Sequence, residues 1–349
     1  MRIWFKRTAF VLALVLFGLT ILNANWLAPD PKGAPKLIAH RGLAQLYNPD
    51  GVGRDTCTAD RIEEPWHGYL ENTVESITRA RKLGAWMVEI DVAPTSDGEL
   101  AVFHDWTLDC RTDGSGEIRN TTMKELKALD VGYGYTSDGG QTFPFRGQFI
   151  GAMPTFEEAV RAMSLRGRLM VNFKSADPEE ADLVAAKLKQ LGRDPVAKGD
   201  AFYGHAEPVR RIRKLYPDVW AWSPSEARQC SEDYIKFGWT GFLPESCKGN
   251  TMIVPLNYQW AFWGWPNRLI ARMEEYGGNI IVVGPHGDHP SSGITLPEQL
   301  TEIPASFNGY VWVDDSLNVI PSLIQRFDDR TEEERAAGAA ALKRRRLEL

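Results

Sequence analysis

Hydrophobic residues recur along this chain in short, dense runs separated by longer segments with helical spacing. The runs predict eight buried strands at 36–40, 86–92, 169–173, 201–205, 219–223, 251–256, 279–283 and 309–313, and the spacing between them predicts helices at 73–83, 154–163, 178–191, 208–215 and 267–276. Because parallel strands need a crossover connection, this alternation favours an α/β fold of the (β/α)8 TIM barrel class. An open doubly wound sheet is the alternative, but no glycine-rich dinucleotide motif follows the first strand.

Two segments interrupt the alternation. Residues 43–68, after the first strand, and 120–153 are rich in glycine, aspartate and aromatic residues without a clear period, which predicts inserted loops. After the second strand, Asp97-Gly98 marks a tight turn and 99–104 returns as the second arm of a hairpin. We therefore expect a Pro-rich linker at 29–35, the barrel at 36–327, and a charged tail at 328–349 that forms a solvated helix.

The first 28 residues differ in composition from the rest. Arg2, Lys6 and Arg7 precede an apolar run at 9–22, the pattern of a signal peptide or an N-terminal membrane anchor. The run is shorter than the roughly 20 residues of a full span, and the cleavage sites at Ala24 and Ala28 fit imperfectly. A buried core helix is the alternative, which the three cations disfavour. Because basic residues stay in the cytoplasm, either targeting route predicts a periplasmic or extracellular protein.

The cysteines agree with export, since an even number in an oxidising compartment suggests disulfides. We expect Cys57 to pair with Cys110 and Cys230 with Cys247; four free thiols are the alternative. The net charge of -6 and the lack of a basic, aromatic-rich stretch argue against a nucleic-acid partner.

Two carboxylates are the first candidates for chemistry. Glu89 and Asp91 are two residues apart on a predicted strand, so their side chains share one face. If that face is the barrel interior, they converge near the end where such barrels keep their active sites. Close carboxylates resist ionising together, and one divalent cation such as Mg²⁺ or Ca²⁺ would relieve this. Simple pairing with arginine or lysine is the alternative.

Two histidines complete the set. His40 ends the first strand beside Arg41, and the hairpin brings His104 back towards the carboxylates. One imidazole can take a proton from a nucleophile while the other gives one to a leaving oxygen. A cation and an arginine can stabilise the charge that develops on a phosphoryl group. This combination predicts phosphodiester cleavage.

The order and spacing of these residues resemble the glycerophosphodiester phosphodiesterase family. The resemblance is clear over 37–116 and rests on His40-Arg41-Gly42, Glu71-Asn72-Thr73, Glu89-Ile90-Asp91-Val92, Asp97-Gly98 and His104-Asp105. It implies a barrel that hydrolyses glycerophosphodiesters to an alcohol and glycerol phosphate. It also implies general acid and base roles for His40 and His104, and phosphate contacts for Arg41 and Lys174.

By the same resemblance, Glu89 and Asp91 are metal ligands, and Glu71 is either a ligand or a group that holds a histidine. The family usually has a further glutamate ligand two residues before the lysine of the third barrel strand, and this chain has Asn172 there. An amide oxygen can bind a hard cation but brings no charge, so we expect weaker metal binding.

Three less specific features leave alternatives open. An aromatic group, Trp260, Phe262, Trp263 and Trp265, could grip an acyl chain, which would make the protein a lysophospholipase D-like enzyme, or could touch the membrane; ordinary packing explains the group as well. Strand-end residues His205, His286, Asp288 and His289 could contact the substrate, bind a second metal or simply be polar loop residues. Finally, Asn172 would also suit a barrel that binds a phosphodiester without cleaving it.

Overall fold

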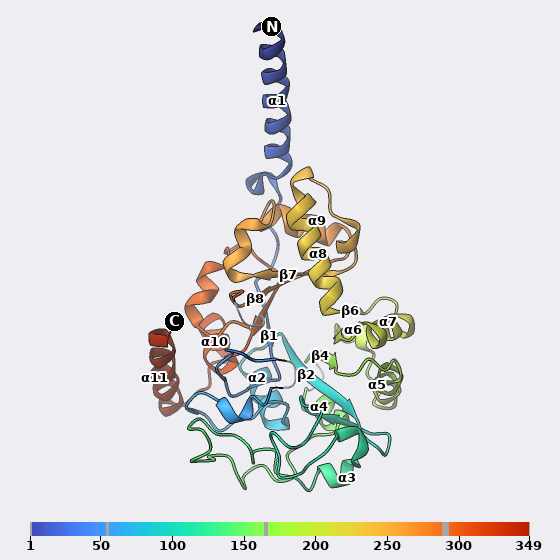
Figure 1. Ribbon diagram of the computed structural model, residues 1–349, viewed down its shortest axis with the longest axis vertical. Coiled ribbons are helices and arrows are strands. Elements are labelled where there is room, and N and C mark those ends of the chain that lie inside the picture. Colours follow the sequence, from blue (N-terminus) through green and yellow to red (C-terminus); the bar gives the residue numbers. More distant parts are fainter. Residues whose placement is uncertain (1, 54–55, 164–166, 288–292, 349) are drawn as a thin grey trace.

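A computed structural model describes residues 2–53, 56–163, 167–287 and 293–348 as a (β/α)8 barrel (Figure 1). Eight parallel strands follow one another around it in the order β6-β5-β4-β2-β1-β9-β8-β7. Their bounds are β1 Lys36–Ala39, β2 Met87–Pro94, β4 Leu169–Phe173, β5 Ala201–Gly204, β6 Trp220–Trp222, β7 Thr251–Pro255, β8 Asn279–Val283 and β9 Tyr310–Val313. All eight predicted strands are present, and the barrel prediction is confirmed.

The predicted hairpin is also present. Strand β3, Leu100–Val102, runs antiparallel to the end of β2, with Val92 opposite Val102. The loops of both insertions pack beside it around a second hydrophobic core that includes Leu70, Phe103 and Tyr135. The insertion at 120–153 contains one short helix, α3 Met123–Leu126, and is otherwise irregular.

Side chains close the seam between β6 and β7, where no backbone pairing joins the described strands. The Trp220 indole donates to Thr251 Oγ1 over 2.9 Å, which links the starts of the two strands. Backbone groups on the unpaired edges of β6 and β7 bond side chains instead. Arg213 donates to the carbonyl of Ala221, and Ser231 Oγ bonds both the amide and the carbonyl of Ile253. Unpaired backbone groups at these edges would otherwise be costly.

The five predicted helices form, and two long ones were missed. The expected helices are α2 Val74–Lys82, α4 Phe156–Ala162, α5 Glu179–Gln190, α7 Ala206–Leu215 and α9 Asn267–Glu275, and the unexpected ones are α8 Pro224–Phe237, α10 Ser316–Leu323 and the short α6 Pro195–Lys198. Helix α8 is mostly polar and buries only Ala227, Cys230 and Tyr234, so few apolar residues mark its helical spacing. The sequence signal that could have identified α8 is its N-terminus, where Ser223 and Glu226 form a capping box around Pro224.

Alternation along the strands separates two apolar layers. On β2, Val88, Ile90 and Val92 pack outward against the helices, whereas Met87 joins the cluster that fills the barrel interior. Glu89 and Asp91 follow Met87 at steps of two, so both carboxylates point inward as expected.

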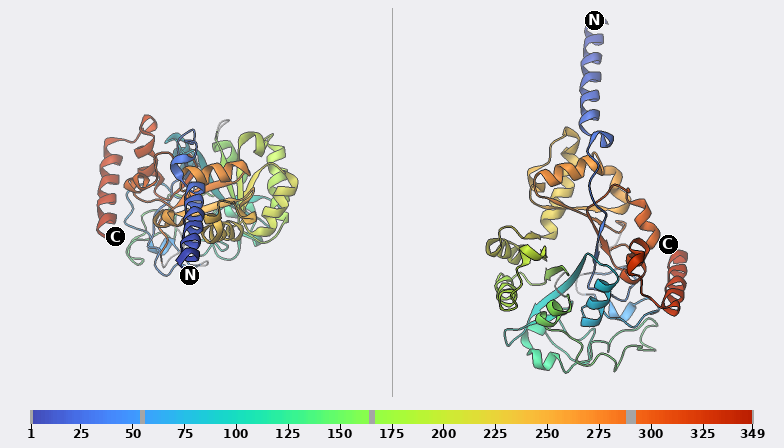
Figure 2. Two further views of the ribbon diagram at one scale, coloured as in Figure 1. Left: turned by 90° about the horizontal axis from the view of Figure 1, so that it is seen from above. Right: turned by 180° about the vertical axis from the view of Figure 1, so that it is seen from behind.

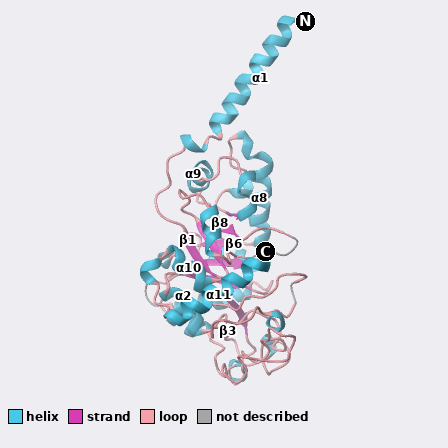
Figure 3. Ribbon diagram, turned by 90° about the vertical axis from the view of Figure 1, so that its left-hand side faces the viewer, coloured by secondary structure: helices cyan, strands magenta, loops and turns pink. Residues whose placement is uncertain are grey.

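The two ends of the chain lie on different parts of the barrel. Helix α1, Arg2–Leu22, projects away from the body at the end opposite the inserted loops (Figures 1 and 2). Its segment Trp4–Leu22 is long and apolar enough to cross a membrane, and none of it is buried (Figure 3). The tail forms α11, Glu332–Glu348, but the expectation of a solvated helix is wrong: Ala341, Leu342 and Arg345 are buried against the barrel.

Both expected disulfides are formed. Cys57–Cys110 joins the insertion after β1 to the loop that follows β3, and Cys230–Cys247 joins α8 to a turn before β7. The alternative of free thiols is therefore wrong, since the four cysteines, all within the described chain, are bridged.

Candidate active site

His40 lies directly after β1 and is held from behind by Asp314, which follows the neighbouring strand β9. Their Nδ1 and Oδ1 atoms are 2.8 Å apart, and the second Asp314 oxygen accepts from the amide of Gly293 at 2.7 Å. The other ring nitrogen, Nε2, faces Glu89 Oε2 at 4.0 Å. Burial opposes ionisation of Asp314, but its bond to His40 holds its pKa below the ordinary value. Asp314 thus fixes the ring orientation of His40.

The two carboxylates of β2 are fully buried and differ in their partners. Glu89 accepts from the Tyr203 hydroxyl and from the backbone amide of Arg41, each at 2.8 Å. Burial and the neighbouring charge of Asp91 raise the pKa of Glu89 to about 7. Burial also opposes ionisation of Asp91, but nearby cations, led by Lys174, hold the Asp91 pKa well below its ordinary value. One member of the pair therefore stays ionised while the other retains a proton near neutral pH.

Arg41 enters the site through an unusual backbone turn. It has a φ of 56° and is followed by Gly42 at 79°, so the chain bends sharply as it leaves β1. A Cβ at Gly42 would lie 2.8 Å from Ser76 Oγ and 2.9 Å from the Ser76 carbonyl carbon, which explains glycine at this position. The bend brings the Arg41 guanidinium to 3.4 Å from both Asp91 and Glu71.

His104 is oriented by a chain of buried ion pairs. Its Nδ1 lies 2.6 Å from Asp105 Oδ1, and Asp105 Oδ2 accepts from Arg111 at 2.8 Å. Arg111 also donates to Glu71 at 2.6 Å and to the Tyr135 hydroxyl at 2.7 Å. Burial, together with the positive charges of Arg41 and Lys174, lowers the pKa of His104 to about 4. His104 is therefore neutral at physiological pH.

Glu71 lies among these cations rather than beside the carboxylates of β2. Its Oε1 accepts from Arg111 and Arg41, while Oε2 is buried without a hydrogen-bond partner among the described residues. This placement matches the expectation that Glu71 helps to hold a histidine, through Arg111 and Asp105. A direct ligand role for Glu71 stays a prediction.

The atoms around Asp91 decide whether a metal cation can bind here. Asn172 lies beside Asp91 on β4 and donates its amide to Asp91 Oδ1 at 2.8 Å, while Lys174 Nζ lies 3.6 Å from the same oxygen. Asp91 thus also makes the simple pairing with arginine and lysine considered above. No group of three His, Cys, Asp or Glu side chains suited to a metal occurs within the described ranges. Two repelling carboxylates and an amide oxygen that becomes available when Asn172 turns fit a weakly held hard cation.

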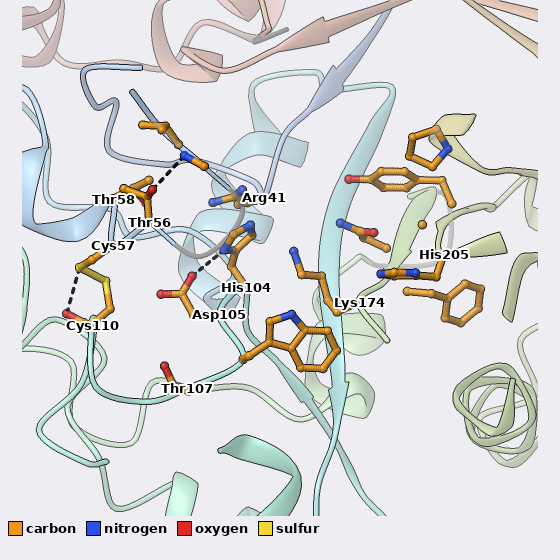
Figure 4. A pocket seen from close by; sticks show the side chains of 18 of the residues that line it. Arg41, Thr56, Cys57, Thr58, His104, Asp105, Thr107, Cys110, Lys174 and His205 are labelled. Carbon is orange, nitrogen blue, oxygen red and sulfur yellow. Dashed lines mark hydrogen bonds and ion pairs between the residues drawn. A yellow bond between two sulfur atoms is a disulfide. The ribbon is translucent and has the colours of Figure 1, made fainter. Parts of the chain in front are cut away.

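A cavity of about 1010 Å³ lies beside these groups; Arg41, His104 and Lys174 line it, whereas His40, Glu89 and Asp91 are not among its described lining residues. Arg41, His104 and Lys174 converge in it from three different elements (Figure 4). The Cys57–Cys110 disulfide and the insertion after β1 form one wall, and His205 at the start of α7 lies on the other. The cavity is large enough to hold a molecule that carries a phosphodiester.

The aromatic group considered above lies outside this cavity. Among the described residues that line it, none belongs to the group of Trp260, Phe262, Trp263 and Trp265. Phe262 is buried and Trp265 packs against Phe307, whereas Trp260 is exposed.

The other strand-end residues also differ in whether they line the cavity. Of the histidines, His205 lines the cavity and His286 packs edge-on against Tyr258. Asp288 and His289 lie outside the described residues.

Three functional groups were not expected from the sequence: Asp314, Tyr203 and Arg111. Asp314 and Tyr203 lie on strands far along the chain, and only barrel closure brings them to His40 and Glu89. Asp314 did carry a signal, since it follows a predicted strand at the end where the site was expected. Arg111 lies in an irregular loop and carried none.

Comparison with known proteins agrees with this geometry. The profile of the glycerophosphoryl diester phosphodiesterase family matches residues 40–203, which contain His40, Glu89, Asp91, His104 and Lys174. Over these residues, the chain is similar to this family. A glycerophosphodiester phosphodiesterase of Bacillus subtilis is 33% identical over 135 residues, covering 36% of this chain and 45% of its own. Mouse glycerophosphodiester phosphodiesterase 1 is 34% identical over 155 residues, covering 44% and 42%.

The solved structures of the family show the same fold. The glycerophosphoryl diester phosphodiesterase domain of a Mycobacterium tuberculosis protein matches 84% of this chain and 99% of its own, with a TM-score of 0.59 and 17% identity. An Oleispira antarctica phosphodiesterase, solved with the product sn-glycerol-3-phosphate, matches 85% and 98%, with a TM-score of 0.52 and 21% identity. The sequence alignments are shorter: the chain spans 26–59% of the length of the first curated relatives it matches.

Proposed function

We propose that this protein is a phosphoric diester hydrolase that cleaves glycerophosphodiesters to an alcohol and glycerol phosphate. The observation that carries the proposal is the pair of histidine–aspartate dyads, His40–Asp314 and His104–Asp105, on either side of buried carboxylates and cations. Similarity to the family over 40–203 and the bound product in the Oleispira enzyme agree with it.

The dyads define the proton chemistry. Asp105 accepts a hydrogen bond from His104 Nδ1–H, which leaves Nε2 with a free lone pair in the neutral ring. Asp314 orients His40 in the same way. One imidazole then removes a proton from the attacking oxygen, and the other protonates the leaving oxygen.

Cationic side chains neutralise the phosphoryl oxygens. Arg41 is pre-oriented by its backbone turn and by Glu71, and Lys174 reaches the cavity from the end of β4. Both can contact the non-bridging oxygens as negative charge builds up. When bound by Glu89, Asp91 and the Asn172 carbonyl, one Mg²⁺ or Ca²⁺ would supply Lewis-acid stabilisation at the same place.

The substrate is proposed to be a small, water-soluble diester rather than a lysophospholipid. The aromatic group that would grip an acyl chain lies outside the cavity. We also propose that the chain is exported to the periplasm or the extracellular space, because the apolar part of α1 follows Arg2, Lys6 and Arg7 and because two disulfides are formed.

The test is glycerophosphocholine hydrolysis by the purified full-length chain in detergent, with EDTA, Mg²⁺ or Ca²⁺. We expect metal-dependent release of glycerol phosphate that falls at least ~100-fold in His40→Ala and His104→Ala, the scale of general acid–base catalysis. His286→Ala is the matched control, because the exposed His286 ring packs edge-on against Tyr258 rather than against an aspartate of either dyad. Binding without turnover would indicate a non-catalytic barrel, and turnover of lysophospholipids alone would indicate the lysophospholipase D-like activity.

A further inference from the structure

The junction between α1 and the barrel is built like part of the fold rather than like a removable leader. Arg272 of α9 is buried and donates to the carbonyl of Leu22 at 2.8 Å and to Asn23 Oδ1 at 3.1 Å. Asn23 in turn donates to the carbonyl of Trp239 at 2.7 Å. Ala24 is itself buried. The residues directly after the apolar run therefore satisfy polar groups of the barrel.

The next turn makes a second set of contacts. Asn25 Oδ1 accepts from the backbone amide of Asn267 at 2.7 Å, which caps the start of α9. Asp30 accepts from the Asn267 side chain at 3.0 Å. Cleavage after Ala24 would remove the Leu22 and Asn23 acceptors of buried Arg272, and cleavage after Ala28 would remove the Asn25 cap as well. A signal peptide that is discarded has no reason to carry these contacts.

Exposed aromatic side chains surround the same junction. The group, which we term the collar, is Trp26 (74% exposed), Phe237 (56%), Trp239 (43%), Phe242 (79%) and Trp263 (43%). Two of its members lie beside the base of α1: the Trp239 carbonyl accepts from Asn23, and Gly241, next to Phe242, approaches Leu22. Trp263 donates its indole N–H to the carbonyl of Ile235 in α8. Large aromatic residues that are this exposed are unfavourable in water but are enriched at membrane interfaces.

We propose that α1 is retained as a membrane span and that the collar is a lipid-facing surface that seats the barrel on the bilayer. The span Trp4–Leu22 ends directly at the collar, so a bilayer around α1 places the acyl-chain boundary at these aromatic side chains. The inserted loops, which help to line the cavity, lie at the far end of the molecule (Figures 1 and 2). The cavity therefore faces the aqueous phase, where soluble diesters are available.

Retention is tested first. The full-length chain is expressed in a bacterial host, membranes are washed with carbonate, and the intact mass of the protein is measured. We expect the complete chain, N-terminal segment included, in the carbonate-resistant fraction. A mature chain that begins between residues 23 and 29, or release by carbonate, would overturn retention. Neither result depends on phosphodiesterase activity, so failure here is distinct from failure of the proposed reaction.

The collar is tested with an added fluorophore. Phe242→Trp places a tryptophan in the collar, and Ile150→Trp places one at a similarly exposed site (66%) in the distal insertion. Both full-length variants are reconstituted in phosphatidylcholine vesicles with and without bromine near the top of the acyl chains. We expect the emission added by Phe242→Trp to fall at least twofold with bromine, and that added by Ile150→Trp to stay constant. Equal quenching of the two would refute the lipid-facing collar.

Discussion

The role of Asp314 can be tested by changing a single atom. Asp314 Oδ2 accepts from the Gly293 amide, so the oxygen of Asp314→Asn must stay there, and its NH₂ group must face His40 Nδ1. The neutral ring of His40 then carries its proton on Nε2, the atom that faces the reaction. The substitution keeps the shape of the site but inverts the tautomer.

The magnitude follows from two contributions. A hydrogen bond to a charged group contributes ~1.5–3 kcal/mol, which corresponds to roughly 10–150-fold in rate if it is lost only from the transition state. Inversion of the tautomer removes more, up to the ~10⁴-fold limit of general acid–base catalysis. We therefore expect kcat for glycerophosphocholine to fall by ~10²–10⁴ with little change in KM.

Steady-state kinetics and thermal unfolding together provide the measurement. Asp105→Asn is the natural companion, because Asp105 Oδ2 accepts from Arg111 and its amide must likewise turn towards His104. Both variants should keep a melting temperature within a few degrees of the parent. Activity within threefold of wild type in a folded Asp314→Asn protein would refute the dyad reasoning.

Three further predictions concern the charges of the site. Because the pKa of Glu89 is raised to about 7, cation binding should release a proton, and cation affinity should weaken up to ~tenfold per pH unit below 7. Calorimetry in buffers of different ionisation enthalpy would detect the released proton, and a binding heat that does not depend on the buffer would exclude it. Asn172→Glu adds a third carboxylate and should lower the cation concentration for half-maximal activity at least ~tenfold, whereas Asn172→Gln should not. Arg111→Met leaves Glu71 and Asp105 buried without their main partner and should destabilise the fold by ~3–5 kcal/mol in denaturant unfolding; Arg161→Met, which breaks an exposed pair, should leave the unfolding midpoint unchanged.

Most of the fold could be predicted from local sequence patterns. Each barrel strand is a short apolar run bounded by turn residues, and tertiary structure did not override that preference. Helix α8 was missed because it is mostly polar and has only three buried side chains, so its cap was the clearer signal. Helix α11 was predicted, but its burial was not. Its buried Arg345 forms ion pairs with Glu63 and Asp315, and these partners are so far away in sequence that no local pattern indicates the contact.

For the site, the sequence by itself determined which groups point inward. A two-residue step on a strand places Glu89 beside Asp91 whatever the surroundings, and a tight turn returns His104 to the same end of the barrel. Only the tertiary structure decided what each group meets. Asp314 reaches His40 because barrel closure pairs β9 with β1, and Arg111 reaches Glu71 because a disulfide and an inserted loop pack there. These partners are separated by 274 and 40 residues, and contacts at such separations depend on chain closure, which local periodicity does not encode.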